Sequence, residues 1–245
     1  MDFSSKYSSR YPLSSKYDIN WVFENQMGPN VLWLLESLCE KLAINSEMRV
    51  LDLGCGRAIS SIFLSDNFNP IIFAHDLWIQ PSENYGRIVK HGKENRIFPI
   101  YGNATELPYS ENYFDAVISI DAFQYFGVEN NYIGYLGKFV KQNGHIGIVV
   151  PGFTREFDEN IPEYLKPFAK EFRTTQWWKN HIGQNEAVTL EHIDVIETGH
   201  EDWLDFLELQ IKTGVARDRD ENDYQLLSND KEKDLCFIRM VIKIN

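Results

Sequence analysis

Cysteine is scarce in this chain. Only Cys39, Cys55 and Cys236 occur among its 245 residues, and their spacing is not that of a metal site. An odd number of widely separated cysteines argues against both a disulfide framework and a zinc centre. We therefore expect no bound metal ion and a reducing compartment, for which the cytoplasm is the simplest choice.

Long apolar runs and excess positive charge are missing as well. No apolar run reaches the roughly 18 residues that a membrane span needs, and the first residues lack the apolar core of a signal peptide. Lys and Arg number 24 against 36 Asp and Glu, which gives a formal net charge of −12. Because binding to a phosphate backbone needs clustered Lys and Arg, we expect neither a nucleic-acid partner nor a membrane partner.

The most informative stretch that is present runs from Met48 to Phe63. An apolar run there ends in Asp52, and Gly54 and Gly56 follow before a segment with helical character. A strand, a glycine turn and a helix in this order are typical of nucleotide sites in parallel α/β domains. The glycines allow a positive φ and a close approach of the backbone to a ligand. Taken alone, the two-glycine loop is weak evidence, because an ordinary turn would use the same residues.

Two later stretches strengthen this interpretation. The run from Pro70 to Asp76 is a second apolar strand ending in an acid, 76 − 54 = 22 positions after the first glycine. Dinucleotide folds place an acid about 20 residues on, where it accepts hydrogen bonds from ribose hydroxyls. The third stretch is the loop 102–109, which is followed by an apolar strand within 113–123.

In this order and spacing, over roughly residues 28–150, these motifs resemble the class I S-adenosylmethionine-dependent methyltransferases. The resemblance implies a Rossmann-like α/β fold with a seven-stranded, mostly parallel sheet and an antiparallel last strand. Near-continuous apolar runs alternating with helices support a parallel sheet covered on both faces. We expect strands at about 49–53, 70–76, 96–101, 116–120, 145–150, 188–196 and 235–244.

We expect a single methyltransferase domain over 1–245. Its parts are an N-terminal cap segment 1–26, a cofactor-binding core 27–150, a cap insertion 151–187, and C-terminal strands and a helix over 188–245. Both cap segments are rich in aromatic residues, too many for solvated chain. We expect them to meet above the carboxyl ends of the strands and to close over the cofactor. Residues 218–223 are very polar, and we expect a loop there.

The resemblance also implies roles around S-adenosylmethionine or its product, S-adenosylhomocysteine. The loop of Gly54, Cys55 and Gly56 would pass under the methionine part, and Asp52 would help to hold the amino group. Asp76 would accept both ribose hydroxyls. An ordinary turn or cap role for Asp52, and a solvated strand-end role for Asp76, remain alternatives.

The remaining cofactor residues are implied in the same way. Leu77 would lie against the adenine, Asn103 would meet the adenine amino group, and the Ala104 N–H would point at a ring nitrogen. Asp121 would face the methionine end and the substrate. Asn103 stands where the family usually has Asp, so this hydrogen bond would lack charge; a turn role is the alternative here too. A second departure is Ala58, in place of a third glycine.

Catalytic residues are not identified by the sequence. Gln124 and Tyr125 follow the fourth expected strand and are the candidates, but Gln cannot act as a general base at neutral pH. The function we expect is methyl transfer to a small, partly apolar acceptor. A nicotinamide-dependent oxidoreductase and a non-catalytic S-adenosylmethionine-binding protein are the alternatives. The acceptor atom, the pathway and the choice between monomer and homodimer stay open.

Overall fold

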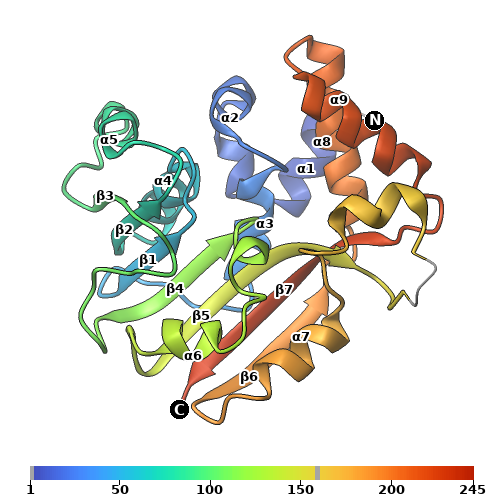
Figure 1. The fold of residues 1–245 in the computed structure, drawn as a ribbon. Coiled ribbons are helices and arrows are strands. Elements are labelled where there is room, and N and C mark those ends of the chain that lie inside the picture. The colour runs from blue at the N-terminus through green and yellow to red at the C-terminus, as the bar shows by residue number, and fades with distance from the viewer. Residues whose placement is uncertain (1–2, 158–160) are drawn as a thin grey trace.

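A central sheet dominates the computed structural model, which describes residues 3–157 and 161–245 (Figure 1). Its order is β3-β2-β1-β4-β5-β7-β6. Only β7 runs antiparallel to its neighbours, which confirms the expected seven-stranded sheet with an antiparallel last strand. The strands are β1 Arg49–Leu53, β2 Ile71–Asp76, β3 Ile97–Tyr101, β4 Phe114–Ile120, β5 Val140–Phe153, β6 Val188–Val195 and β7 Leu235–Ile244.

The strand order places the ends of three strands together. β1 pairs in parallel with β2, with Leu53 opposite His75, and on its other side with β4, with Asp52 opposite Ile118. After β1 the chain first adds β2 and β3 on one side of β1 and then crosses over to add β4 and β5 on the other side. In open parallel sheets, such a reversal point leaves a crevice at the carboxyl ends of the strands, and ligands bind there.

Helices cover both faces of the sheet (Figure 1). The buried side chains form two clusters, one on each face of the sheet, and each cluster includes a different group of helices. The first group contains α3 Val31–Cys39, α4 Ile59–Asn67, α5 Pro81–Lys90 and α8 Gly199–Thr213. The second contains α6 Tyr132–Gly137 and α7 Thr175–Ile182.

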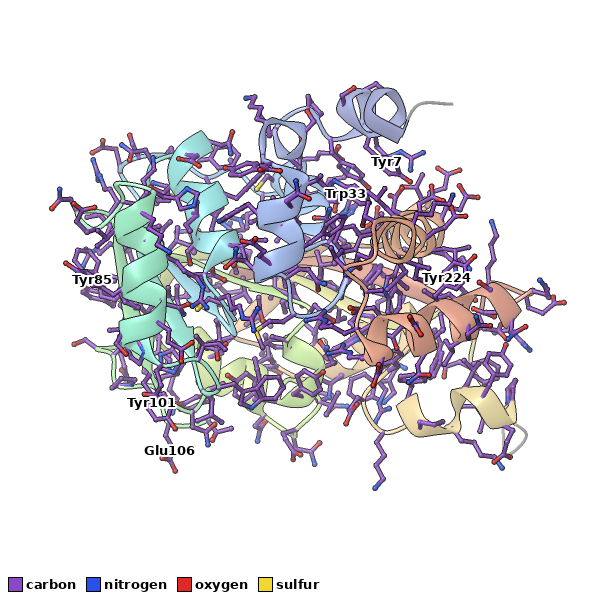
Figure 2. The ribbon with its side chains drawn as sticks, turned by 90° about the horizontal axis from the view of Figure 1, so that it is seen from above. Tyr7, Trp33, Tyr85, Tyr101, Glu106 and Tyr224 are labelled. Carbon is purple, nitrogen blue, oxygen red and sulfur yellow. The ribbon has the colours of Figure 1, made fainter. Side chains whose placement is uncertain are left out.

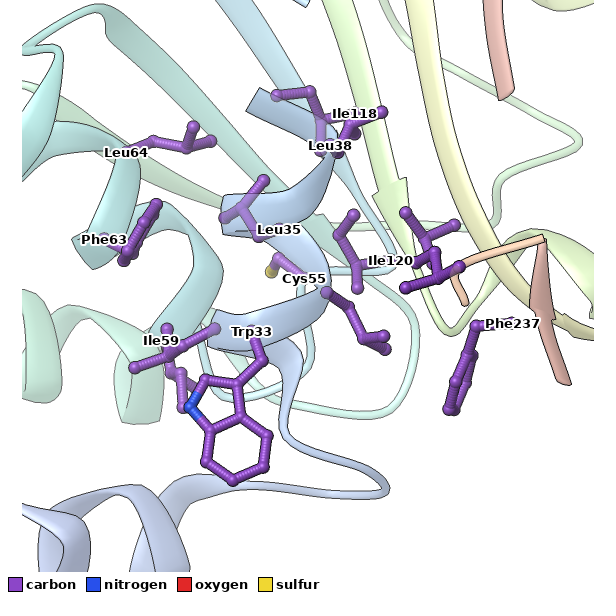
Figure 3. Packing of buried hydrophobic residues seen from close by; sticks show 14 of the residues in the cluster. Trp33, Leu35, Leu38, Cys55, Ile59, Phe63, Leu64, Ile118, Ile120 and Phe237 are labelled. Carbon is purple, nitrogen blue, oxygen red and sulfur yellow. The ribbon is translucent and has the colours of Figure 1, made fainter. Parts of the chain in front are cut away.

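Helix α3 is the centre of the first layer. Asn30 caps it, because its side-chain oxygen accepts hydrogen bonds from two backbone N–H groups of the first turn at 3.1 and 3.4 Å. Leu35 and Leu38 are fully buried, with Phe63 of α4 on one side and Ile118 of β4 on the other (Figure 3). Burying such side chains contributes roughly 1.5–3 kcal/mol each.

The N-terminal segment is ordered, as its aromatic content predicts. It forms α1 Phe3–Arg10, a short 3₁₀ turn η1 Ser14–Lys16 and α2 Ile19–Asn25. The Tyr7 ring stacks on Trp33 of α3 with 4.3 Å between centroids (Figure 2). The Tyr11 hydroxyl donates a hydrogen bond to Asp202 of α8 at 2.5 Å. These contacts fix α1 against α3 and α8.

Residues 151–187 do not form a single insertion. β5 continues to Phe153, and the 3₁₀ turn η3 Glu163–Phe168 precedes α7. Trp178 of α7 packs near Phe123 beneath the sheet, with ring centroids 5.9 Å apart. Tyr164 of η3 donates a hydrogen bond to Asp230 at 3.1 Å. The aromatic residues of this stretch are therefore divided between two regions of the fold.

The expectation of a loop at 218–223 is wrong, because helix α9 spans Asp218–Asn229. Asp220 closes its first turn by accepting hydrogen bonds from the Arg217 backbone N–H at 2.9 Å and from Arg217 Nε at 2.8 Å. Three of the acidic residues that suggested a loop, Asp218, Asp220 and Glu221, lie in the first turn, where the helix dipole favours negative charge. None of the helices in the described ranges is long and apolar enough to cross a membrane.

Candidate functional site

A cleft of about 300 Å³ opens at the carboxyl ends of β1, β2 and β4. This volume lies at the lower end of the range for small-molecule sites. Segments that are far apart in the sequence build its wall. The lining residues come from within 25–31, 53–60, 75–78, 102–105 and 120–126, with Arg219 added from α9.

The glycine loop after β1 forms the floor of the cleft. Gly54 has a φ of +76° and Gly56 a φ of +52°. A Cβ on Gly54 would lie only 2.4 Å from the Ala122 Cβ, so a side chain is excluded there twice over. The backbone N–H groups of Gly54 and Cys55 both donate to the His75 carbonyl, at 2.9 and 3.2 Å. The loop is thus tied to the end of β2.

Asp76 lines the cleft at the end of β2, but its carboxylate already has partners. Oδ2 accepts a hydrogen bond from the Gly56 N–H at 2.8 Å. Oδ1 accepts hydrogen bonds from the N–H groups of Trp78 and Ile79, at 2.7 and 2.9 Å. A carboxylate offers about four lone-pair positions. This arrangement therefore leaves room for one additional hydroxyl, not for the two that the sequence interpretation assigned to it.

Asp52 does not line the cleft. It is buried under the glycine loop, where its Oδ2 accepts hydrogen bonds from the Ser60 and Ser61 hydroxyls at 2.6 Å each. Burial raises the pKa of Asp52 to about 6, and the two serine hydrogen bonds oppose this shift. The side chain thus joins β1 to the start of α4, and the amino-group role implied by the resemblance has no support from its position.

Leu77, Asn103 and Ala104 also line the cleft. Leu77 is exposed there. The Asn103 side-chain oxygen accepts a hydrogen bond from the Thr105 N–H at 3.1 Å, which closes a short turn. The Ala104 carbonyl accepts a hydrogen bond from the Tyr132 hydroxyl at 2.9 Å. The turn keeps Asn103 and Ala104 at the surface of the cleft, where the sequence interpretation expects the adenine.

Asp121 follows β4 and has a strained backbone, with a φ of +52°. Gln124 Nε2 donates hydrogen bonds to the Asp121 carbonyl and to its Oδ1, both at 3.1 Å. Burial raises the pKa of Asp121 to about 7, while the positive charge of Arg219 acts in the opposite direction. A strained residue with a shifted pKa in a cleft is a common feature of active sites.

The two catalytic candidates are placed differently. Gln124 is buried and does not line the cleft, so its visible role is to hold Asp121. Tyr125 lines the cleft with a half-exposed ring. Burial and the nearby Asp121 raise the pKa of Tyr125, so its hydroxyl remains protonated at neutral pH.

Several lining residues were not identified from the sequence. Gln26 is 1% exposed, and within the described chain neither of its amide atoms has a hydrogen-bond partner. Such orphaned buried atoms are costly and indicate a ligand. Gly28 lies so close to Asp121 that a Cβ would come within 2.4 Å of Oδ2. Arg219 comes from α9, and no local pattern in the sequence connects it with the glycine loop.

The expected closure by two cap segments is supported only on the N-terminal side. Residues from 25 to 31 line the cleft, whereas none of the described residues of 151–187 does. Two arginines of the C-terminal region hold this N-terminal stretch. Arg219 Nη1 donates a hydrogen bond to the Met27 carbonyl at 3.0 Å, and Arg217 Nη1 donates one to the Gln26 carbonyl at 3.4 Å.

Comparison with known proteins agrees with this geometry. A family model described as a methyltransferase domain matches residues 50–144. A demethylmenaquinone methyltransferase from Listeria welshimeri is 28% identical over 185 residues, which cover 67% of this chain and 74% of that protein. The solved geranyl diphosphate C-methyltransferase from Streptomyces coelicolor superimposes with a TM-score of 0.71 at 12% identity, over 86% of this chain and 78% of that one. Phosphoethanolamine N-methyltransferase 2 from Haemonchus contortus gives a TM-score of 0.72 at 16% identity, over 100% and 60%.

The fold and the matched domain define a methyltransferase. Residues 50–144 match a methyltransferase domain, and the fold is that of the class I S-adenosylmethionine-dependent methyltransferases. The matched domain and the curated relatives support S-adenosylmethionine as the methyl donor. The residues present fit this cofactor, because the floor of the cleft excludes a side chain at Gly54 and the buried Gln26 amide lacks a partner. The comparisons do not support the alternative of a nicotinamide-dependent oxidoreductase.

Proposed function

We propose that this methyltransferase acts on a small, partly apolar acceptor. The observation that carries the proposal is the exposure of large apolar side chains in the cleft, where Trp78 and Tyr125 are 66% and 50% exposed. Exposed apolar surface of this kind marks a binding site for an apolar group. The acidic net charge of −12 supports a small molecule rather than a nucleic acid as acceptor.

The proposed cofactor contacts follow from the placement of the lining residues. The loop from Gly54 to Gly56 lies under the methionine part, and Asp76 accepts one ribose hydroxyl. Asn103 and Ala104 meet the adenine, with Leu77 against its face. The Gln26 amide, which has both a donor and an acceptor to offer, pairs with the polar end of the cofactor. Asp121 lies beside Gly28 and next to Ala122, which contacts Gly54.

When bound, S-adenosylmethionine supplies an already activated methyl group, so the protein mainly aligns the reactants and excludes water. The apolar walls of the cleft serve both purposes. Where the acceptor carries a proton on the attacking atom, we propose that Asp121 receives it. Its pKa of about 7 suits proton transfer at neutral pH, and Gln124 holds one carboxylate oxygen in place.

Formation of S-adenosylhomocysteine with a panel of phenols, amines and carboxylic acids tests the activity. Mass spectrometry of ligands that co-purify with the protein narrows the panel. Hydrogen exchange tests the site without an acceptor. On addition of S-adenosylhomocysteine, we expect slower exchange in residues 25–29, which line the cleft, and unchanged exchange in residues 7–10 of α1. Equal exchange in 25–29 with and without ligand contradicts the proposed site.

A further inference from the structure

Arg219 is held at the cleft by its helix. The adjacent Arg217 side chain grips Asp220 through two hydrogen bonds, at 2.8 and 2.9 Å, and this fixes the first turn of α9. Arg219 Nη1 donates to the Met27 carbonyl, and its Nε forms an ion pair with an Asp223 carboxylate oxygen at 3.6 Å. A guanidinium has five N–H donors. Most of the Arg219 donors therefore remain available to a ligand, and the side chain is 58% exposed.

Trp78 and Tyr125 form a pair of rings in the same cleft. Trp78 follows β2 and Tyr125 follows β4, and their ring centroids are 5.7 Å apart at an angle of 54°. The positive charge of Arg219 lowers the pKa of Tyr125 and of Asp121, against the effect of burial. The geometry agrees, because a Cβ placed on Gly28 would lie 3.7 Å from Arg219 Nη2 and 2.4 Å from Asp121 Oδ2, so the guanidinium lies near Asp121.

A second arginine of the cleft lies in the glycine loop. Arg57 follows Gly56, and its Nη1 donates a hydrogen bond to the Glu24 carbonyl at 2.7 Å. This placement makes Arg57 a neighbour of the proposed cofactor site. Of these two arginines, Arg219 is the one whose charge acts on the pKa of Tyr125.

The acids of the cleft leave this cation accessible to an anion. Asp76 is satisfied by three backbone N–H groups. Asp121 has one oxygen held by Gln124, and its pKa of about 7 means that it does not carry a full negative charge at neutral pH. An anion bound to Arg219 therefore meets less repulsion than two ionised, unpaired carboxylates would produce.

We propose that Arg219, Trp78 and Tyr125 form the acceptor subsite, and that it takes a small planar, apolar acid, such as an aromatic carboxylate. The guanidinium binds the carboxylate through paired hydrogen bonds, and the two rings cover the planar part. The inference rests on the proposed function, because the subsite is defined by its position beside the cofactor.

Calorimetry with the full-length protein saturated with S-adenosylhomocysteine tests the subsite, with benzoate and its neutral isostere benzamide as probes. We expect benzoate to bind about tenfold more tightly than benzamide. Arg219→Gln should lower the benzoate affinity about tenfold and remove this preference, while Arg219→Lys should retain part of it. Trp78→Ala should weaken both probes. Lys212→Gln is the matched control, because Lys212 is an exposed cation outside the cleft.

Each result has a separate meaning. If the wild type does not bind S-adenosylhomocysteine, the proposed function fails before the subsite is tested. If it binds S-adenosylhomocysteine but prefers benzamide or binds neither probe, the subsite is wrong. If Arg219→Gln weakens S-adenosylhomocysteine as much as benzoate, Arg219 is a cofactor ligand and the inference is overturned. Loss of benzoate binding in Lys212→Gln would also overturn it.

Discussion

Replacing Asp76 with alanine should lower the stability of the ligand-free protein as well as its affinity for the cofactor. The carboxylate accepts hydrogen bonds from the backbone N–H groups of Gly56, Trp78 and Ile79, and the residue is 7% exposed. It therefore connects the glycine loop after β1 with the loop after β2. Asp76→Ala removes all three hydrogen bonds and leaves both loops less restrained.

The expected size follows from these three bonds. A hydrogen bond to a charged group contributes about 1.5 kcal/mol or more. Water in the cleft can replace part of each bond, so we take about 1 kcal/mol per bond and about 3 kcal/mol in total. For 245 residues, an unfolding entropy of about 2.1 cal/mol/K per residue gives a loss of about 6 °C in Tm. Loss of the ribose acceptor should weaken S-adenosylhomocysteine binding by about 2 kcal/mol, or about 30-fold.

Urea unfolding of the ligand-free protein and calorimetry with S-adenosylhomocysteine measure the two effects separately. Asp76→Asn is the matched control, because its amide oxygen can still accept two of the three N–H groups while its NH₂ faces a donor. Its loss of stability should be smaller. If Asp76→Ala unfolds at the wild-type urea concentration and only its ligand affinity falls, the carboxylate is a ligand group alone, and the reasoning from the three backbone bonds is refuted.

Three further predictions concern the floor and the walls of the cleft. Gly54→Ala should abolish S-adenosylhomocysteine binding and lower Tm. Adding Ala122→Gly should restore Tm only in part, because it relieves the 2.4 Å contact but not the positive φ of residue 54. Full restoration of Tm would show that the positive φ has no cost in stability. Gln26→Met removes two unpaired buried polar atoms that a ligand would satisfy, so it should leave the Tm of the ligand-free protein unchanged or higher and weaken S-adenosylhomocysteine binding about tenfold. Unchanged affinity in calorimetry would show that Gln26 is not part of the site. The pKa of Asp52 is about 6 in the folded protein, above its usual 3.8, so the contribution of Asp52 to stability falls as pH rises between these values. In urea unfolding, the stability of Asp52→Asn relative to wild type should therefore increase by about 2–3 kcal/mol between about pH 4 and pH 7.5. A difference in stability that does not change with pH contradicts the raised pKa.

Local patterns in the sequence were sufficient for the strands and for the position of the cleft. The glycine loop, Asp76 and the loop containing Asn103 each follow a strand, and parallel strands bring such loops to one edge of the sheet. Asp52 shows the limit of this reasoning. Its position just before the glycine loop is shared by ligand residues and by structural residues. Only the Ser60 and Ser61 hydroxyls, placed there by the first turn of α4, show that its carboxylate is used within the protein.

Apolar periodicity and glycines close together in the chain were enough to predict the sheet and the floor of the cleft. The long-range walls of the cleft are visible only in the three-dimensional fold. Gln26 and Arg219 are 193 residues apart, and they line one cleft because α9 packs beside α8 and its arginines hold the carbonyls of residues 26 and 27. A polar helix such as α9 carries no apolar stripe strong enough to reveal its place in the sequence. Its position follows from long-range hydrogen bonds, which a local pattern does not encode.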